Sequence, residues 1–279
     1  MSDTSTTVYV GQRDVVSVSG EEAVTYLQGQ LSQDVQSLPL GESRWSFILQ
    51  PQGKVDAWFR VTRTADDAFL LDVDAGYGEV LLARLKRFKL RTKADLSLDT
   101  WTLHAYLGDV PEGAEASIVS PSADERGTDL IGPELAEPAG VVIDDEQYEH
   151  RRILAAIPAM GSELDDSTIP AESGMVDRSV SFTKGCYTGQ ELVARVDSRG
   201  NNTPRRLRII SGRGDVPEAR ELHAGETIAG TVTSIVRDGD GWIGLAYVKR
   251  SAFDETTLQI QDAVAEVRPG SSEPGKPGS

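Results

Sequence analysis

The sequence predicts an α+β protein in which two ferredoxin-like α/β lobes precede a small antiparallel β-barrel. With 279 residues, of which 39% are hydrophobic, the chain is long enough for two or three lobes. In positions 1–100, apolar residues recur with the spacing of a strand in some segments and of a helix in others, and these segments follow one another in the order of a ferredoxin-like lobe. After position 204, short β-prone runs are separated by glycine turns, which is typical of a barrel.

The first lobe is expected to span residues 1–100. Its strands are predicted at 15–18, 44–50, 54–63, 68–73 and 94–98, and its helices at 19–31 and 78–88. Ser19 and Glu22 have the spacing of a capping box, which would start the first helix. Alternation in the strand at 54–63 places Asp56 and Trp58 on the face opposite its apolar residues.

The rest of the chain is expected to form a second lobe at 101–200, a barrel lobe at 201–268 and a disordered tail at 269–279. For the second lobe we predict strands at 101–107 and 128–131, an exposed loop at 110–126 and a helix at 144–153. The barrel strands are predicted at 207–210, 227–234 and 242–248.

Composition limits the partners of this chain. A formal net charge of −16 repels nucleic acid, so duplex binding is not expected. No apolar run has membrane-spanning length, and the first residues lack the basic segment of a signal peptide. A single cysteine excludes an internal disulfide, which fits a reducing compartment. We therefore expect a cytoplasmic protein without a membrane partner, and the sequence leaves its oligomeric state open.

Positive charge is concentrated in two stretches of this acidic chain, at 84–93 and 195–208. Local cations could hold the carboxylates of a small polyanionic ligand while the overall field stays negative. The alternative, especially for the first stretch, is a solvated helix face. Both interpretations stay open from the sequence.

The stretch at 180–195 contains the only cysteine of the chain. Lys184 and Gly185 are typical of a turn, and Thr188 with Glu191 has the spacing of a second capping box. Cys186 is therefore expected just before a helix N-terminus, where partial positive charge and Lys184 would favour the thiolate. The alternative is that this lone cysteine is a small buried core residue.

The residues Lys184-Gly185-Cys186-Tyr187-x-Gly189-Gln190-Glu191 resemble the signature of the YgfZ family, folate-binding proteins related to the aminomethyltransferase (T-protein) of the glycine cleavage system. Two further motifs of that family are matched. Its R…P-x-x-G-x-E…P-x-E segment corresponds to Arg152, Pro158, Gly161, Glu163, Pro170 and Glu172. Its Q-G-Q…D motif corresponds to Gln28, Gly29, Gln30 and Asp34. The resemblance extends over residues 14–253.

This resemblance implies a three-lobed aminomethyltransferase-like fold around a central folate-sized cavity. It also implies tetrahydrofolate, or a one-carbon-substituted folate, as the cofactor, with a carboxylate near N5 of the pterin. In the aminomethyltransferases that carboxylate belongs to a G-G-x-x-D-D segment, whereas here Asp56 is followed by Ala57. We assign the folate site from the family motifs and from residues that lie next to them in the sequence. The residues assigned are Asp56, Trp58, Arg152, Glu163, Lys184, Tyr187, Gln190 and Glu191. Any chemistry would be carried by Cys186 and Asp56.

Three of these residues have structural alternatives. Asp56 could simply be solvated, and Trp58 could cover a lobe interface instead of packing a pterin ring. Arg152 could bind a carboxylate bidentately or be an ion-pair partner within the protein.

The function favoured by the resemblance is a tetrahydrofolate-binding accessory protein that supports assembly or repair of iron–sulfur clusters. Its partners would be a reduced folate, including polyglutamylated forms, and iron–sulfur proteins or assembly factors. The alternative is a folate-dependent aminomethyltransferase, against which the missing second acid and the presence of Cys186 argue. A third hypothesis is a binding module in which Cys186 only packs. Because a cluster needs about four thiolates, Cys186 alone could not hold one.

Overall fold

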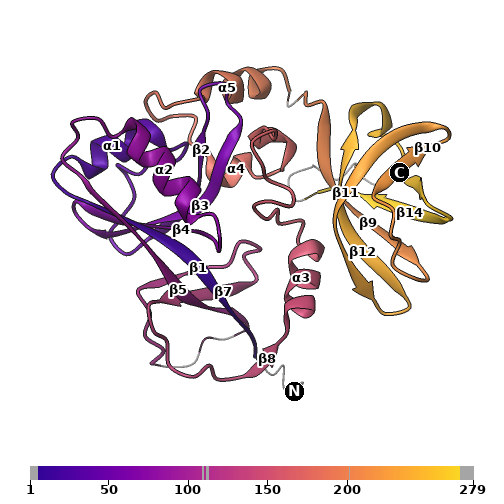
Figure 1. Cartoon of the computed structure of the whole chain (residues 1–279), viewed down its shortest axis with the longest axis horizontal. Helices are drawn as coiled ribbons and strands as arrows, with labels where there is room; N and C mark the ends of the chain where they lie inside the picture. Colours follow the sequence, from indigo (N-terminus) through magenta and orange to yellow (C-terminus); the bar gives the residue numbers. More distant parts are fainter. Residues whose placement is uncertain (1–5, 109, 111–112, 201, 271–279) are drawn as a thin grey trace. The chain divides into compact units, whose positions relative to one another are not determined.

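The structure, a computed structural model, describes residues 6–108, 110, 113–200 and 202–270 (Figure 1). Most of the tail predicted at 269–279 lies outside these residues. The chain has an α+β fold that divides into two compact units. Unit 1 comprises residues 1–145 and 178–190, and unit 2 comprises residues 146–177 and 191–279. No helix in the described part of the chain is long and apolar enough to cross a membrane.

Unit 1 is built on an eight-stranded sheet with the order β2-β3-β4-β1-β5-β7-β6, in which β8 pairs with β1. The strands are β1 (Thr7–Ser19), β2 (Ser43–Leu49), β3 (Val55–Ala65), β4 (Ala68–Asp74), β5 (Asp95–Leu107), β6 (Ile118–Pro121), β7 (Gly127–Gly132) and β8 (Val141–Ile143). Helix α1 (Ala23–Gln30) follows β1, and α2 (Gly78–Phe88) contacts β1, β3, β4 and β5. The predicted strands at 44–50, 54–63 and 68–73 and the predicted helix at 78–88 are confirmed.

The capping box predicted at Ser19 is wrong. Ser19 is the last residue of β1, and α1 begins at Ala23 with Glu22 as an N-cap that makes no side-chain cap. The Glu22 carboxylate instead accepts a hydrogen bond of 2.6 Å from the backbone N–H of Lys93. The Glu22 side chain therefore makes a tertiary contact instead of the helix cap that the local spacing predicts.

The middle of the chain also differs from the sequence prediction. Strand β5 joins the two strands expected at 94–98 and 101–107, and all of it pairs with β1. The border expected at residue 100 therefore lies inside a strand, and the division into three lobes remains a prediction. The exposed loop expected at 110–126 contains β6, whose Ile118 is 1% exposed because it pairs with β7.

Unit 2 contains a closed barrel with the strand order β10-β11-β12-β9-β14-β13, which confirms the predicted antiparallel barrel. Its strands are β9 (Arg205–Arg213), β10 (Glu221–Ala224), β11 (Thr227–Asp238), β12 (Gly241–Lys249), β13 (Thr257–Ile260) and β14 (Ala263–Arg268). Helix α3 (Asp145–Leu154) confirms the helix predicted at 144–153, and its Ile153 packs against Leu207, Ile243 and Leu245 of the barrel.

Buried charges occupy the face of β3 that the sequence placed opposite its apolar residues. Arg60 is 1% exposed, and its guanidinium contacts Asp72 of β4 at 3.0 Å and Asp129 of β7 at 3.1 Å. Arg13 shares the Asp72 carboxylate at 3.1 Å, and the Trp45 ring lies 5.3 Å from the Arg60 guanidinium. Charges at such depth are tolerated only when they are paired, so this cluster links β3, β4 and β7.

We expect Arg60→Leu to destabilise unit 1 by about 3–5 kcal/mol, because it removes the cation paired with the buried Asp129 and leaves the buried Asp72 with Arg13 alone. Urea unfolding followed by tryptophan fluorescence measures the change. The matched control is Lys93→Leu, which removes a cation with a 68% exposed side chain from its pair with the 74% exposed Glu21 and should cost about 0–1 kcal/mol. Equal losses in the two variants would contradict the role given to the buried cluster.

Candidate functional site

The segment at 180–190, which we call the signature loop, belongs to unit 1 and is anchored at the end of α1. The Lys184 ammonium donates hydrogen bonds to the carbonyls of Gln28 and Leu31 at 2.6 Å and of Gln33 at 3.1 Å. The last carbonyls of a helix lack partners within the helix, and a cation there is favoured by the helix dipole. Lys184 therefore caps α1 and uses all three of its N–H donors on its own chain.

The surroundings of Lys184 are partly desolvated. Burial lowers the pKa of Lys184 to about 8, and the nearby Asp34 carboxylate opposes this shift. The ammonium also lies 5.1 Å from the Tyr187 ring, a cation–π distance. Tyr187 is 9% exposed, and burial raises the pKa of its hydroxyl to about 12. Both residues thus hold the loop in place.

The Q-G-Q…D motif and the signature loop meet at this end of α1. The Gln28 side-chain amide donates to Asp34 at 2.9 Å, which shapes the turn after the helix. The Gly29 carbonyl accepts the backbone N–H of Thr188 at 3.3 Å. The Gln30 side-chain oxygen accepts a hydrogen bond from Arg84 of α2 at 3.3 Å. Two motifs that are far apart in sequence therefore form one substructure.

Gly189 fits the signature loop onto the turn between β2 and β3. Its φ of +84° is in the region that favours glycine. A Cβ atom on Gly189 would lie 2.5 Å from the carbonyl oxygen of Gln50 and 2.8 Å from the Cβ of Leu49. The loop backbone thus approaches the end of β2 more closely than any side chain would permit.

The second predicted capping box is also wrong. Helix α5 (Gln190–Ser198) begins two residues after Thr188, and the Gln190 side chain accepts the backbone N–H of Tyr187 at 3.2 Å. Glu191 lies exposed in the first turn of the helix. The tight contact at Gly189 sets the start of α5, which the side-chain spacing could not reveal.

Asp56 is held at the start of β3 by an arginine of α2. The Arg84 Nε donates to the Asp56 Oδ2 at 2.9 Å, with the two side chains 7% and 18% exposed. Arg84 also donates to the Leu49 carbonyl at 2.8 Å, and its guanidinium lies 3.9 Å from the Phe88 ring. No donor in the described part of the chain contacts the Asp56 Oδ1. This oxygen remains able to accept a hydrogen bond from a ligand.

Arg84, the residue that holds Asp56, is missing from the site predicted from the sequence, where it belongs only to a basic stretch. It lies on the buried face of α2 with Leu81 and Leu85. The sequence signal for this contact is an arginine on the apolar face of a predicted helix. A charge at such a position is buried and therefore needs a partner of opposite charge.

Cys186 is exposed to solvent. This contradicts the interpretation of the cysteine as a core residue. It also weakens the argument from the helix terminus, because Cys186 lies four positions before the first residue of α5 and the helix dipole acts over about one turn. Cys186 and Asp56 both belong to unit 1. The signature loop contacts the ends of α1 and β2, and Arg84, which holds Asp56, bonds Gln30 and Leu49 at these same ends.

Trp58 is engaged by its own unit. Its side chain is 3% exposed, its Nε1 donates to the Ser179 hydroxyl at 2.9 Å, and its ring stacks on Trp45 at 4.2 Å. With one ring face covered by Trp45 and the side chain buried, Trp58 has little surface left for a ligand. The geometry supports a packing role rather than ligand stacking.

Arg152 and Glu163 form a buried ion pair within unit 2. Arg152 directs its donors to Glu149, Glu163, the Ile157 carbonyl and the Ser234 hydroxyl. These contacts use all five N–H groups of the guanidinium. Glu163 is 1% exposed and also accepts the Ser234 hydroxyl at 2.6 Å. The geometry supports the ion-pair alternative for Arg152 and leaves no donor for a folate carboxylate.

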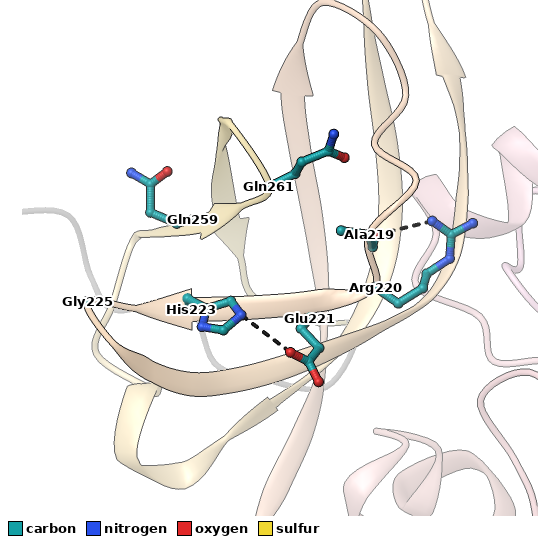
Figure 2. Close-up of a pocket in the computed structure, with 7 residues that line it drawn as sticks. All are labelled: Ala219, Arg220, Glu221, His223, Gly225, Gln259 and Gln261. Atoms are coloured by element: carbon teal, nitrogen blue, oxygen red, sulfur yellow. Dashed lines mark hydrogen bonds and ion pairs between the residues drawn. The ribbon is translucent and has the colours of Figure 1, made fainter.

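Two surface concavities of unit 2 contain none of the predicted folate-site residues. The first, of about 550 Å³, is lined by Ala219, Arg220, Glu221, His223, Gly225, Gln259 and Gln261 (Figure 2). There the His223 imidazole faces the Glu221 carboxylate at 3.5 Å, and Arg220 donates to carbonyls of its own loop. The second, of about 530 Å³, is lined by Ser167, Glu172, Pro204, Arg205, Lys249, Arg250 and Ser251.

Comparison with known proteins gives relatives over most of the chain. An iron-sulfur cluster assembly factor IBA57 homolog of Pyricularia oryzae is 30% identical, over 91% of this chain and 74% of the relative. The tRNA-modifying protein YgfZ of Aliivibrio fischeri is 25% identical, over 90% of this chain and 87% of the relative. No family model matches the chain.

A solved structure shares the fold. The glycine cleavage system aminomethyltransferase T of Bartonella henselae superposes with a TM-score of 0.74, covering 96% of this chain and 86% of that one. At 17% sequence identity this similarity concerns the fold alone. It confirms the aminomethyltransferase-like architecture that the motifs implied.

We expect Gly189→Ala to destabilise the protein by about 1–3 kcal/mol, because the backbone conformation is strained for alanine and the methyl group would meet the end of β2. Gly185→Ala is the matched control, since its Cβ meets no atom within 4 Å. Thermal unfolding measures stability, and the alkylation rate of Cys186 reports displacement of the loop. Similar results for the two alanine variants would contradict the close approach.

The lowered pKa of Lys184 predicts a pH dependence of stability. Its pKa is about 8 in the folded protein against 10.5 ordinarily, so the unfolded chain binds more protons between these pH values. The free energy of unfolding of the wild type, measured relative to Lys184→Arg, should therefore increase from pH 8 to 10.5. The arginine stays charged over this range. A flat or falling difference would show that the ammonium is not desolvated.

Proposed function

Since this chain belongs to the family that contains YgfZ and the IBA57-type iron–sulfur cluster assembly factors, we propose that it is a tetrahydrofolate-binding accessory protein for assembly or repair of iron–sulfur clusters. The observation that carries this proposal is the exposed Cys186 on a loop that packs against the ends of α1 and β2, since Arg84, which holds Asp56, bonds the same two ends. Its cellular location would be the cytoplasm.

Asp56 is the residue we assign to the pterin of the folate. Its Oδ2 is fixed by Arg84, and its Oδ1 can accept an N–H of the ligand. A bound tetrahydrofolate would supply the nitrogen atoms that carry a one-carbon unit. Among the other residues carried over by resemblance, Glu191 is exposed. Lys184, Tyr187 and Gln190 would act on binding through the position of the signature loop.

Cys186 is the residue we assign to the partner. An exposed thiol can serve as one thiolate of a shared cluster, exchange with a thiol of another protein or react with a one-carbon unit. About three further thiolates would have to come from an iron–sulfur protein or an assembly factor. The partners we propose are therefore a reduced folate and a cysteine-bearing protein of that class.

The aminomethyltransferase alternative is not favoured. Ala57 is buried where the matching segment of the aminomethyltransferases has its second acid, and Asp56 is engaged by a buried arginine. The name of the YgfZ relative points to tRNA modification. The net charge of −16 argues against a direct contact with RNA as the main activity of this chain.

Folate binding and thiol function are separated by two variants. Tetrahydrofolate should raise the melting temperature of the wild type, since a ligand bound only by the folded state stabilises it by about 2.7 kcal/mol at one hundred times its Kd. Asp56→Asn should lose at least half of that shift, whereas the control Asp66→Asn, at an exposed position, should keep it. Cys186→Ser should keep the shift but fail to restore iron–sulfur enzyme activity in a deletion strain.

Each half of the proposal can fail separately. A wild type that shows no shift with saturating tetrahydrofolate would refute folate binding. Full restoration of iron–sulfur enzyme activity by Cys186→Ser would refute the role of the thiol and leave folate binding standing.

A further inference from the structure

The second concavity of unit 2 lies where β9 begins and β12 ends, two neighbouring strands in Figure 1. Arg205 and Lys249 are paired in register, and the backbone N–H of Arg250 donates to the Pro204 carbonyl at 2.9 Å. Ser167 and Glu172 contribute the remaining wall from the segment that precedes the barrel. Backbone pairing between two barrel strands therefore brings three cationic side chains to one depression of about 530 Å³.

This depression is basic in a strongly acidic chain. Its lining has three cations, Arg205, Lys249 and Arg250, against the single carboxylate of Glu172. Acidic residues outnumber basic ones by 44 to 28 in the sequence, so this local excess of cations is opposite to the charge balance of the chain. Within the described part of the chain, the side chains of Lys249 and Arg250 make no ion pair, and both are exposed.

Arg205 is held in a fixed orientation at the wall of this depression. Its Nε donates to the Glu172 carboxylate at 3.0 Å, and its guanidinium lies 4.1 Å from the Tyr247 ring. Glu172 is 5% exposed in its side chain, so the acid serves this pair and adds little negative charge at the surface. An arginine anchored on one edge keeps its side chain ordered without an added ligand, which lowers the entropic cost of binding an anion.

We propose that this basic concavity binds a small multivalent oxyanion, a ligand class independent of the function proposed for the signature loop. Guanidinium and ammonium groups match the oxygens of phosphate and carboxylate groups. The hydroxyl of Ser251 supplies a further donor at its edge, whereas the Ser167 hydroxyl already donates to Asp165 at 2.6 Å. The size of the depression suits a small molecule, and the overall field of the chain opposes an extended polyanion.

The test is isothermal titration calorimetry at a fixed ionic strength of about 0.15 M, with inorganic pyrophosphate and citrate as probes. The site variant is Lys249→Gln with Arg250→Gln, both at exposed positions. The control variant is Arg213→Gln with Arg268→Gln, two exposed residues of the same barrel that give the same change in net charge. We expect saturable binding to the wild type, at least tenfold weaker binding to the site variant, and unchanged binding to the control.

The two probes distinguish the sources of the oxyanion. Tighter binding of pyrophosphate indicates a phosphorylated ligand, and tighter binding of citrate indicates a polycarboxylate. No saturable binding of either probe to the wild type would overturn the proposal, as would equal losses in the two variants. Binding of single-stranded RNA that depends on Lys249 and Arg250, without competition by pyrophosphate, would also overturn the assignment to a small anion.

Discussion

The contact between the Lys184 ammonium and the end of α1 is the interaction on which the candidate site depends. Three carbonyls in the stretch 28–33 share this cation. Without it, the helix end would be left with unpaired acceptors in a partly buried position, and the signature loop would lose its anchor. The loop carries the exposed Cys186, so the position of the thiol follows from how α1 ends. A lysine with three short contacts is well suited to this task because it can approach several carbonyls from one point.

Two arginines connect separate elements of unit 1 in the same way. Arg84 joins α1, β2, β3 and α2 through one guanidinium, and Arg60 joins β3, β4 and β7 through another. Each is buried and paired, so removal of either leaves polar groups without partners rather than only losing a contact. The scaffold around Asp56 is therefore polar and specific. Several motif residues that invite a ligand-binding interpretation, Trp58, Arg152 and Glu163 among them, are used by the protein itself.

The sequence sufficed for what depends on local periodicity. The strand at 54–63, the helix at 78–88 and the barrel were all predictable, because apolar spacing reflects burial on one face. Sequence-based prediction failed where a side chain can hydrogen-bond either to a residue nearby in the sequence or to one far away. The Glu22 carboxylate accepts a hydrogen bond from Lys93 instead of capping its helix, and the Lys184 ammonium donates to the carbonyl of Gln28, 156 positions away. Motif residues could be located from the sequence, but which of them face a ligand and which face the protein depends on such long-range contacts.

The exposed thiol and the occupied motif residues together limit what this chain can do alone. A side chain that already uses all its hydrogen bonds within the fold cannot also be the main recognition group for a ligand. Arg152 and Lys184 satisfy that condition, whereas Asp56, Glu191 and Cys186 keep capacity for an external partner. One thiol supplies about a quarter of the ligands of a cluster. Under the proposed function, a fixed loop that offers a single thiol lowers the ordering cost of a shared complex without completing it, so a cluster at Cys186 would have to be shared with a second protein.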